Sequence, residues 1–545
     1  MTSLHLTILL LLFNLSIYAQ QLTDTHPIII KTDRSSYISG DDLFFSVFLY
    51  NGIVTDNEPG PDVYIDITDV DNKWVEGLGT ITMQINGTAN GVINLPDTLL
   101  TGYYKIRAYT NYPNLINHFS SIEIFITNRF GKEPEAILRD MNSHRDTIKT
   151  SQIISIEKDK YRTRENITIN LSCNDSIKAL VKIVTKKQWE EQSMPVFGTH
   201  DSFVIDERYT PLTPYDGIIV AGTVTDSTNT PISDAIVLVS MQDSVVRIKY
   251  DITDSTGTFC VLLHNYYNEQ QIFINAFNKH FQPYYNANIE LRNQFDFENN
   301  SSNNLIQVYT VTDSSELDKA LIAKAFELQA FMPVGISDRP VVSNDHLIIG
   351  KPRHTAYTDN YIPLNNFREI TRELTPFIRL RKNKSGEAEL RILNEYNITM
   401  NNPLLLVDGV PLTQLDKLLD KGSDIIKIVE TQNKSRHFGN INFDNGIISI
   451  WTHNYNFWGK CKVPGTFEFL VHSSQKPLTE NKTTDTKDRL PNLKQTIYWN
   501  PNINTTEQKC ISAQLSDECG EFVIEFFGIQ RNGKIIKDFK LINVK

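Results

Sequence analysis

Short apolar segments separated by polar turns recur along most of the chain. Residues 43–50 (LFFSVFLY) are apolar on both alternating faces, which is typical of a strand in the centre of a sheet. In residues 103–109 (YYKIRAY) apolar side chains alternate with Lys105 and Arg107, as in a strand with one buried face. Turn signals between such strands predict a β-sandwich over residues 20–130.

Two later parts of the chain show related patterns. Residues 155–171 repeat the turn and strand of the first block in a shorter form and predict a second sandwich-type unit over residues 150–205. From residue 218, strands then alternate with a turn at Pro231 and an Asp-x-x-Gly turn at Asp254. This pattern predicts an antiparallel β-domain over residues 215–295.

One segment has the period of a helix. Ser314 or Ser315 can cap a helix over residues 314–331, because the apolar side chains that follow recur on one face. These side chains are Leu317, Leu321, Ala325 and Leu328. Residues 313–362 are therefore expected to form this helix and a connecting segment.

The next block combines strands with a short helix. Residues 403–411 (PLLLVDGVP) predict a buried strand that ends in a turn, residues 412–419 a helix, and residues 424–430 and 446–452 two further strands. Apolar positions alternate in the three strands, and two leucines of the helix are expected to cover them. The alternating positions are Leu404, Leu406, Ile426, Ile428, Ile448 and Ile450, and the covering residues are Leu415 and Leu419.

The whole chain is therefore predicted to be mainly β, with tandem β-sandwich domains and one small α+β domain. The α+β domain is expected over residues 363–455, and a C-terminal β-domain over residues 461–545. Hydrophobic residues make up 40% of the chain and charged residues 21%, which excludes wholesale disorder. The formal net charge of −11 argues against a broad nucleic-acid-binding face.

An apolar run near the N-terminus indicates the compartment. Residues 4–18 are apolar and precede Ala19, which is typical of a cleaved secretory signal over residues 1–19, with a mature chain that starts at Gln20. An uncleaved anchor is the alternative, because no Lys or Arg precedes Lys31. No later segment has 18 consecutive apolar residues, so only peripheral membrane association is expected.

The first block also carries a family resemblance. Residues 31–41 (KTDRSSYISGD) and 100–110 (LTGYYKIRAYT) resemble segments of the second macroglobulin-type domain, as found in α2-macroglobulins and in envelope proteins of Bacteroidetes. Ser39 stands where that family often has proline. The Cys-x-x-Gln thioester of macroglobulins has no counterpart here, so covalent trapping is not implied.

Three further segments carry resemblances in the same order as in large Bacteroidetes envelope proteins. Residues 218–259 resemble the carboxypeptidase regulatory-like (transthyretin-like) domain, which has no catalytic residues, and residues 403–452 resemble the plug domain of TonB-dependent receptors. Residues 495–529 resemble a short β-domain that follows such plug-like segments. Only about 90 residues follow Asn454, whereas a receptor barrel takes several hundred, so a plug-like domain without the β-barrel is implied.

No motif points to catalysis, a cofactor or a metal, so no site residue of these kinds is expected and the chain is predicted not to be an enzyme. Asp408 is interpreted as part of an Asp-Gly turn, His437 as a solvated loop residue, and Asp41 with Asp42 as a polar turn rather than a cation site. Cys510 and Cys519 could form a disulfide across a hairpin or remain thiols. Tripeptides at 97–99, 146–148, 175–177 and 243–245 match a short O-glycosylation motif known for Bacteroidetes.

Three functions remain open from the sequence. The leading hypothesis is a non-enzymatic envelope protein that binds other proteins at the periplasmic face of the outer membrane, with an outer-membrane transport or secretion component as the suspected partner. The second is a surface-exposed adhesin or ligand-binding protein, because residues 534–545 (KIIKDFKLINVK) resemble C-terminal signals of type IX secretion. An enzyme is the third, and no constellation of residues supports it.

Overall fold

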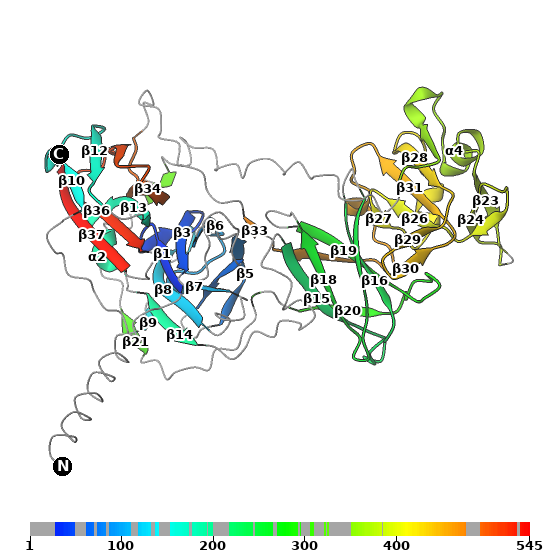
Figure 1. Ribbon diagram of the computed structural model, residues 1–545, viewed down its shortest axis with the longest axis horizontal. Coiled ribbons are helices and arrows are strands. Elements are labelled where there is room, and N and C mark those ends of the chain that lie inside the picture. The colour runs from blue at the N-terminus through cyan, green and yellow to red at the C-terminus, as the bar shows by residue number, and fades with distance from the viewer. Residues whose placement is uncertain are drawn as a thin grey trace, which may run out of the picture. The chain divides into compact units, whose positions relative to one another are not determined.

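Strands dominate the part of the chain that the structure describes (Figure 1), which confirms the predicted mainly β fold with sandwich domains. Contacts divide the chain into two units: unit 1 comprises residues 1–215, 295–338 and 474–545, and unit 2 comprises residues 216–294 and 339–473. The predicted signal over residues 1–19 lies outside the described residues. The computed structural model describes residues 28–49, 62–69, 73–82, 87–110, 118–131, 137–140, 153–173, 177–192, 195–199, 217–242, 246–264, 270–292, 295, 306–309, 321–322, 324–325, 350–383, 385–472, 474–475, 491–530 and 535–545.

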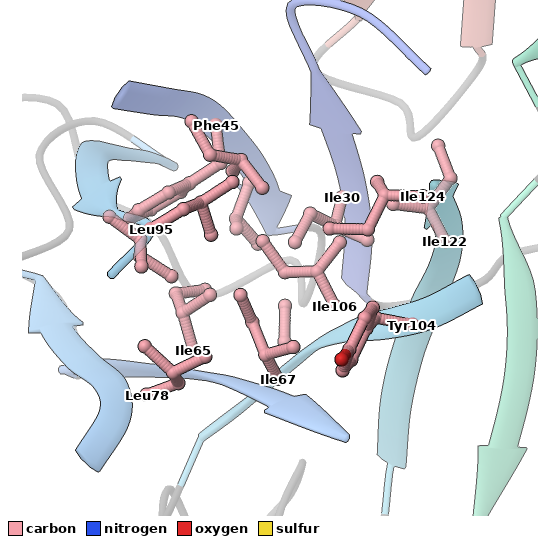
Figure 2. Close-up of a cluster of buried hydrophobic side chains, with 14 of the residues drawn as sticks. Ile30, Phe45, Ile65, Ile67, Leu78, Leu95, Tyr104, Ile106, Ile122 and Ile124 are labelled. Atoms are coloured by element: carbon pink, nitrogen blue, oxygen red, sulfur yellow. The ribbon is translucent and has the colours of Figure 1, made fainter. Parts of the chain in front are cut away.

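The first sandwich of unit 1 encloses a large apolar core between two sheets. Figure 2 shows side chains of both sheets pointing toward one another, among them Ile30 and Phe45 from one sheet and Ile65 and Ile106 from the other. The smaller sheet has the order β1 (Ile28–Thr32), β3 (Asp42–Leu49), β6 (Thr88–Asn94). The larger has the order β14 (Val196–Thr199), β8 (His118–Thr127), β7 (Gly102–Thr110), β4 (Val63–Thr68), β5 (Trp74–Thr82), β33 (Ser474–Gln475), with β2 (Ser36–Ile38) also on β8.

The second sandwich of unit 1 is built from two distant parts of the chain. Strands from residues 153–185 and 496–544 share its sheets, so the larger parts of two blocks that were expected to be separate, 150–205 and 461–545, form one core. One sheet has the order β10 (Ile154–Ile156), β12 (Asn166–Leu171), β35 (Cys510–Gln514). The other has the order β11 (Lys160–Tyr161), β37 (Ile535–Val544), β36 (Gly520–Ile529), β13 (Lys178–Thr185), β34 (Thr496–Asn504).

Three smaller elements complete the described part of unit 1. Helix α2 (Lys186–Glu191) follows β13, and β9 (Ile137–Asp140) pairs with β21 (Ile306–Tyr309). Of the helix predicted over residues 314–331, the structure describes residues 321, 322, 324 and 325, which are helical. Ala325, placed on the apolar face by the sequence, is exposed, whereas Lys324 is buried because it forms an ion pair with Asp41.

Unit 2 begins with an antiparallel sandwich. Its sheets match the strand–turn pattern expected over residues 215–295, but β32, which comes from beyond residue 460, forms an edge of the second sheet. The sheets have the orders β18 (Thr258–His264), β15 (Gly217–Thr225), β20 (Asn288–Leu291) and β17 (Arg247–Ile252), β16 (Ile236–Met241), β19 (Gln270–Phe277), β32 (Phe467–Val471).

The same turn recurs in unit 2 at Asp226, Asp254, Asn278 and Asn394. In each case the side-chain Oδ1 accepts hydrogen bonds of 2.8–3.1 Å from the backbone N–H groups two and four residues later. The fourth residue of each turn has a φ between 56° and 73°. Asp and Asn are favoured at such turns because their short side chains can replace backbone hydrogen bonds.

The remainder of unit 2 is a packed α+β domain. Asn366 caps α4 (Phe367–Glu373) by accepting a 3.0 Å hydrogen bond from the Glu369 N–H. Helix α5 (Asp416–Leu419) contributes Leu418 to the core. The main sheet has the order β22 (His354–Tyr357), β28 (Ile426–Gln432), β31 (Ile447–Thr452), β26 (Leu404–Val407), β27 (Val410–Pro411). Smaller elements are η2 (Thr358–Asn360), β23 (Ile378–Lys382), β24 (Ala388–Leu393), β25 (Thr399–Asn401), β29 (Arg436–Phe438), β30 (Ile441–Phe443) and η3 (Trp458–Lys460).

The alternation expected in this sheet is wrong in two of its three strands, because Ile428 lies in a different apolar cluster from Ile426 and β26 presents the opposite face to the core that it shares with β31. The parallel register pairs Leu405 with Ile448 and Val407 with Ile450, and these four side chains share one core. Leu406 therefore points to the opposite face, where it packs in a second apolar cluster with residues of the preceding sandwich. Both faces of the sheet are covered, so a continuous apolar run such as residues 404–407 does not reveal which face each side chain occupies.

Candidate functional site

Three buried charges of unit 1 lie where its two sandwiches meet. Lys31 of β1 and Lys182 of β13 both face the Glu525 carboxylate of β36, with N–O distances of 2.8 and 3.1 Å. Their side chains are 7%, 0% and 1% exposed, respectively. Phe48 and Phe527 pack edge to face beside this group, with ring centroids 5.0 Å apart. We call Lys31, Lys182 and Glu525 the charged seam.

Electrostatics in the charged seam favour an ionised carboxylate. Burial alone would raise the pKa of Glu525, but Lys182 and Lys31 outweigh burial and lower it to about 2. Burial lowers the pKa of Lys182, and Glu525 offsets only part of this effect. Because two ammonium groups share one carboxylate, Glu525 holds its charge more firmly than Lys182 does.

Polar groups around Lys182 join the second sandwich to the first. The Lys182 ammonium donates to the Thr32 carbonyl at 3.1 Å and to Gln192 Oε1 at 2.6 Å. Gln192 in turn donates to the Thr32 carbonyl at 3.0 Å. Gln188 of α2 accepts hydrogen bonds from the N–H groups of Ser35 and Ser36 at 3.0 and 2.9 Å. The segment after β1 is therefore held by side chains of the second sandwich.

A second charged group follows directly along the chain. Asp41 forms ion pairs with Arg34 at 2.6 Å and with Lys324 at 2.8 Å, so the carboxylate considered as a cation ligand from the sequence already faces two cations. Asp33 accepts hydrogen bonds from the Tyr37 hydroxyl and the Thr496 hydroxyl at 2.7 and 2.8 Å. Burial raises the pKa of Asp33 in spite of these contacts.

Taken together, these groups form structural contacts rather than reactive ones. Each carboxylate named above is held by cations or by donor groups of the same unit, and none lies beside a Ser, Cys or His that it could activate within the described residues. In the same residues, no group of three His, Cys, Asp or Glu side chains could hold a metal ion. The charged seam can therefore position two sandwiches, and this is the chemistry that its geometry supports.

Asp408 occupies the turn predicted from its sequence. Asp408 and Gly409 have φ values of 48° and 82° between the paired strands β26 and β27. The Asp408 side chain is completely buried, and its carboxylate accepts hydrogen bonds from the Thr452 N–H and hydroxyl, both at 2.7 Å, and from the Phe457 N–H at 3.2 Å. Asp408 therefore ties the turn to the end of β31 and to the following loop.

The remaining candidates from the sequence lie apart from the charged seam. His437 is exposed in β29. Cys510 and Cys519 are exposed thiols, and Cys510 lies in β35, which pairs with β12 rather than forming a hairpin across to Cys519. Thr98 of the 97–99 tripeptide is exposed in a turn. Residues 146–148, 175–176 and 243–245 of the other tripeptides lie outside the described residues.

Sequence reasoning missed the charged seam, although a signal for it was present. Lys182 is the one charge within residues 179–184 (ALVKIV), and Glu525 is the one charge between Phe522 and Ile529. A single charge in a strand that is otherwise apolar indicates a buried partner, because an unpaired buried charge is too costly to retain. The sequence does not show which charge is the partner.

Comparisons with known proteins give no family. No protein-family model and no curated protein matches the chain. No helix of the described residues combines the length and apolar character that crossing a membrane requires.

Among solved structures, the chain is similar to trypsin-activated alpha-2-macroglobulin from Escherichia coli, at 9% identity and a TM-score of 0.24, over 95% of this chain and 41% of that one. It is also similar to the D0-D1 domain of intimin, at 11% identity and a TM-score of 0.15, over 46% of this chain and 90% of that one. The adhesin InvE of Yersinia pseudotuberculosis matches at 11% identity and a TM-score of 0.14, over 49% of this chain and 58% of that one. The chain thus spans about two-fifths of the macroglobulin's length, and TM-scores this low do not establish a shared fold.

Proposed function

We propose that the protein is a non-enzymatic, protein-binding scaffold of the cell envelope. The observation that supports this proposal is the charged seam, in which three buried charges hold two sandwiches together. Buried ion pairs contribute little net stability, and in some proteins they specify one geometry, which suits a protein whose function is to present surfaces in a fixed arrangement.

The proposed location is the periplasmic face of the outer membrane, with peripheral association only and no nucleic-acid partner. The apolar run before Ala19 and the order of macroglobulin-like, regulatory-like and plug-like segments support this location. An outer-membrane barrel, or a component of a secretion or transport machine, is the proposed partner. The absence of enzymatic activity is part of the same proposal, and the lack of any catalytic motif in the sequence supports it.

Affinity purification of the tagged protein from envelopes, with identification of what is retained, tests the proposal. We expect one or a few envelope proteins to be retained in stoichiometric amounts, and a protein that is retained alone would contradict the scaffold function. A surface adhesin is the second candidate, supported by the resemblance of residues 534–545 to an export signal. Protease added to intact cells separates the two, because only a surface-exposed protein is then cleaved.

A further inference from the structure

The larger sheet of the first sandwich holds an aromatic side chain on the face that lies away from the core. Asp66 of β4 pairs in register with Gly79 of β5 and Arg107 of β7, whereas the neighbouring residues Ile65 and Leu78 belong to the core. Phe295 packs against Gly79 and is only 1% exposed. Phe295 is thus buried without filling the core of the sandwich.

Aromatic rings and a glycine form the recess around Phe295. The indole of Trp74 stacks on the Phe295 ring at 5.8 Å and 22°, and the ring of Tyr64 meets it edge to face at 6.3 Å. A Cβ atom at Gly79 would lie 2.7–2.8 Å from three atoms at the tip of the Phe295 ring. The recess therefore exists because residue 79 has no side chain.

The walls of this aromatic recess are held in place by contacts that do not involve Phe295. The Trp74 Nε1–H donates to the Leu78 carbonyl at 3.1 Å, and Tyr64 stacks on Tyr109 at 5.7 Å and 12°. The Tyr109 hydroxyl donates to Asp66 at 3.1 Å, and Asp66 accepts two hydrogen bonds from Arg107 at 2.7 and 2.8 Å. A recess whose walls are fixed independently of its occupant is preformed, as ligand sites usually are.

We propose that this recess is a binding site for an extended protein segment that carries a phenylalanine, and that Phe295 is its occupant from the same chain. The site deepens the protein-binding function proposed above and rests on it. Aromatic anchors in pockets of this kind are typical of the residues that dominate protein interfaces. Phe295 is also the first residue of unit 1 after residues 216–294 of unit 2.

The Gly79 backbone lies against the face of the Phe295 ring. The position of a Cβ on Gly79 is 2.7 Å from Cζ and 2.8 Å from both Cε atoms, and such nearly equal distances place it over the flat side of the ring rather than beyond its tip. The contact therefore requires an aromatic ring and a residue without a side chain beneath it, and it does not distinguish phenylalanine from tyrosine.

A labelled peptide tests the site directly. The probe is a fluorescent copy of residues 290–300 (ELRNQFDFENN), and the proteins are the full chain, its Phe295→Ala variant, and the Phe295→Ala/Gly79→Ala double variant. In the wild type, the chain's own Phe295 competes with the peptide at an effective concentration on the order of 1 mM. For a Kd of about 100 µM at the empty recess, this competition weakens the apparent affinity of the peptide roughly tenfold. We expect the peptide to bind the Phe295→Ala protein at least tenfold more tightly than the wild type.

Matched controls define what would overturn the proposal. Gly79→Ala places a Cβ where the phenylalanine ring must lie, so the double variant should lose the binding gained by Phe295→Ala. A peptide with Ala at position 295 should not bind. A folded Phe295→Ala protein that fails to bind the Phe peptide, or that binds the Phe and Ala peptides equally, would rule out the site.

A second measurement does not depend on the folding of Phe295→Ala. Gly79→Ala alone should expel Phe295 from the recess, and cleavage by chymotrypsin after Phe295 should rise at least tenfold. Unchanged cleavage would contradict the proposal. If envelope proteins are retained equally by wild type and Gly79→Ala while the peptide does not bind, the recess is wrong and the scaffold function stands. If the peptide binds but no envelope protein is retained, the recess stands and the scaffold function is wrong.

Discussion

Lys182 and Glu525 stand directly opposite each other in neighbouring strands, with 3.1 Å between Nζ and Oε2 and almost no exposure to solvent. Neither residue belongs to the apolar pattern that predicts its strand. Their pairing, with Lys31 as the third member, occupies the junction of the two sandwiches. Removing Glu525 leaves both ammonium groups buried without compensation, so unit 1 should be sensitive to a substitution at this position.

Glu525→Gln should destabilise unit 1 strongly. The variant leaves two buried ammonium groups facing a neutral amide, and breaking a buried pair in this way costs about 3–5 kcal/mol. Urea unfolding of the full chain, followed by hydrogen exchange of β13 and β36, measures the loss. Glu521→Gln is the matched control, because Glu521 pairs with Lys186 on the surface and is 45% exposed. Equal effects of the two variants would show that the charged seam is not structural.

The stability of unit 1 should depend on pH through the same carboxylate. The pKa of Glu525 falls from its ordinary value of 4.5 to about 2 in the folded protein. The unfolded chain therefore takes up the proton first as the pH falls. This stabilising contribution is complete above pH 4.5 and is lost between pH 4.5 and about 2. Unfolding midpoints measured across this range should fall less steeply for Glu525→Gln than for the wild type.

Substitutions at Leu406 and Asp408 should lower the stability of the α+β domain for different reasons. Leu406→Asp places an uncompensated carboxylate in a completely buried position and should cost several kcal/mol. Turn preference alone predicts a small effect for Asp408→Asn, but the three hydrogen bonds accepted by Asp408 change this expectation. An amide cannot accept all of them, so we expect a cost of about 1–3 kcal/mol.

Thermal unfolding of both variants ranks these effects. Asp416→Asn serves as the control, because Asp416 is an exposed acidic residue in the first turn of α5. A Leu406→Asp protein that melts like the wild type would mean that the second face of the main sheet is not a core. Asp408→Asn without any loss would mean that its buried carboxylate is not needed as an acceptor.

The edge strand β22 of the main sheet in unit 2 should lose stability at acidic pH because of His354. Burial lowers the pKa of His354 below its ordinary value of 6.5, and its Nδ1 has no hydrogen-bond partner among the described residues. The unfolded chain binds the proton more readily than the folded one, so stability is complete above pH 6.5 and declines as the pH falls below that value. Hydrogen exchange in β22 should accelerate between pH 7.5 and 5, after correction for intrinsic rates. His354→Gln should remove the excess acceleration, and an unchanged pH profile would contradict this role.

Turns that depend on neighbouring residues could be predicted well from the sequence. The turns at Asp254 and Asp408 lie where Asp-x-x-Gly and Asp-Gly indicated them. Both depend on residues a few positions apart, so the local sequence determines them. Asn278 and Asn394 form the same turn without a glycine in the fourth position, which is why the pattern Asp-x-x-Gly did not reveal them.

Long-range pairing could not be predicted in the same way. Residues 404–407 are all apolar, so alternation could not show that Leu405 and Val407, rather than Leu404 and Leu406, face Ile448 and Ile450. A bulge between Ile426 and Ile428 further shifts the alternation in β28. Strand order is set by which edges meet in the folded chain, and the sequence of one strand does not specify its neighbour.

Strand β37 has a consequence for how the chain folds. It pairs with β36 along its whole length. It also pairs in parallel with β11, which lies almost four hundred residues earlier in the sequence. The second sandwich therefore cannot close until the final strand has left the ribosome and, in an exported chain, has crossed the membrane. Such distant pairings make folding slow and leave the early strands exposed for longer. Residues 153–185 should therefore be the part of unit 1 that most needs chaperone protection during synthesis and export.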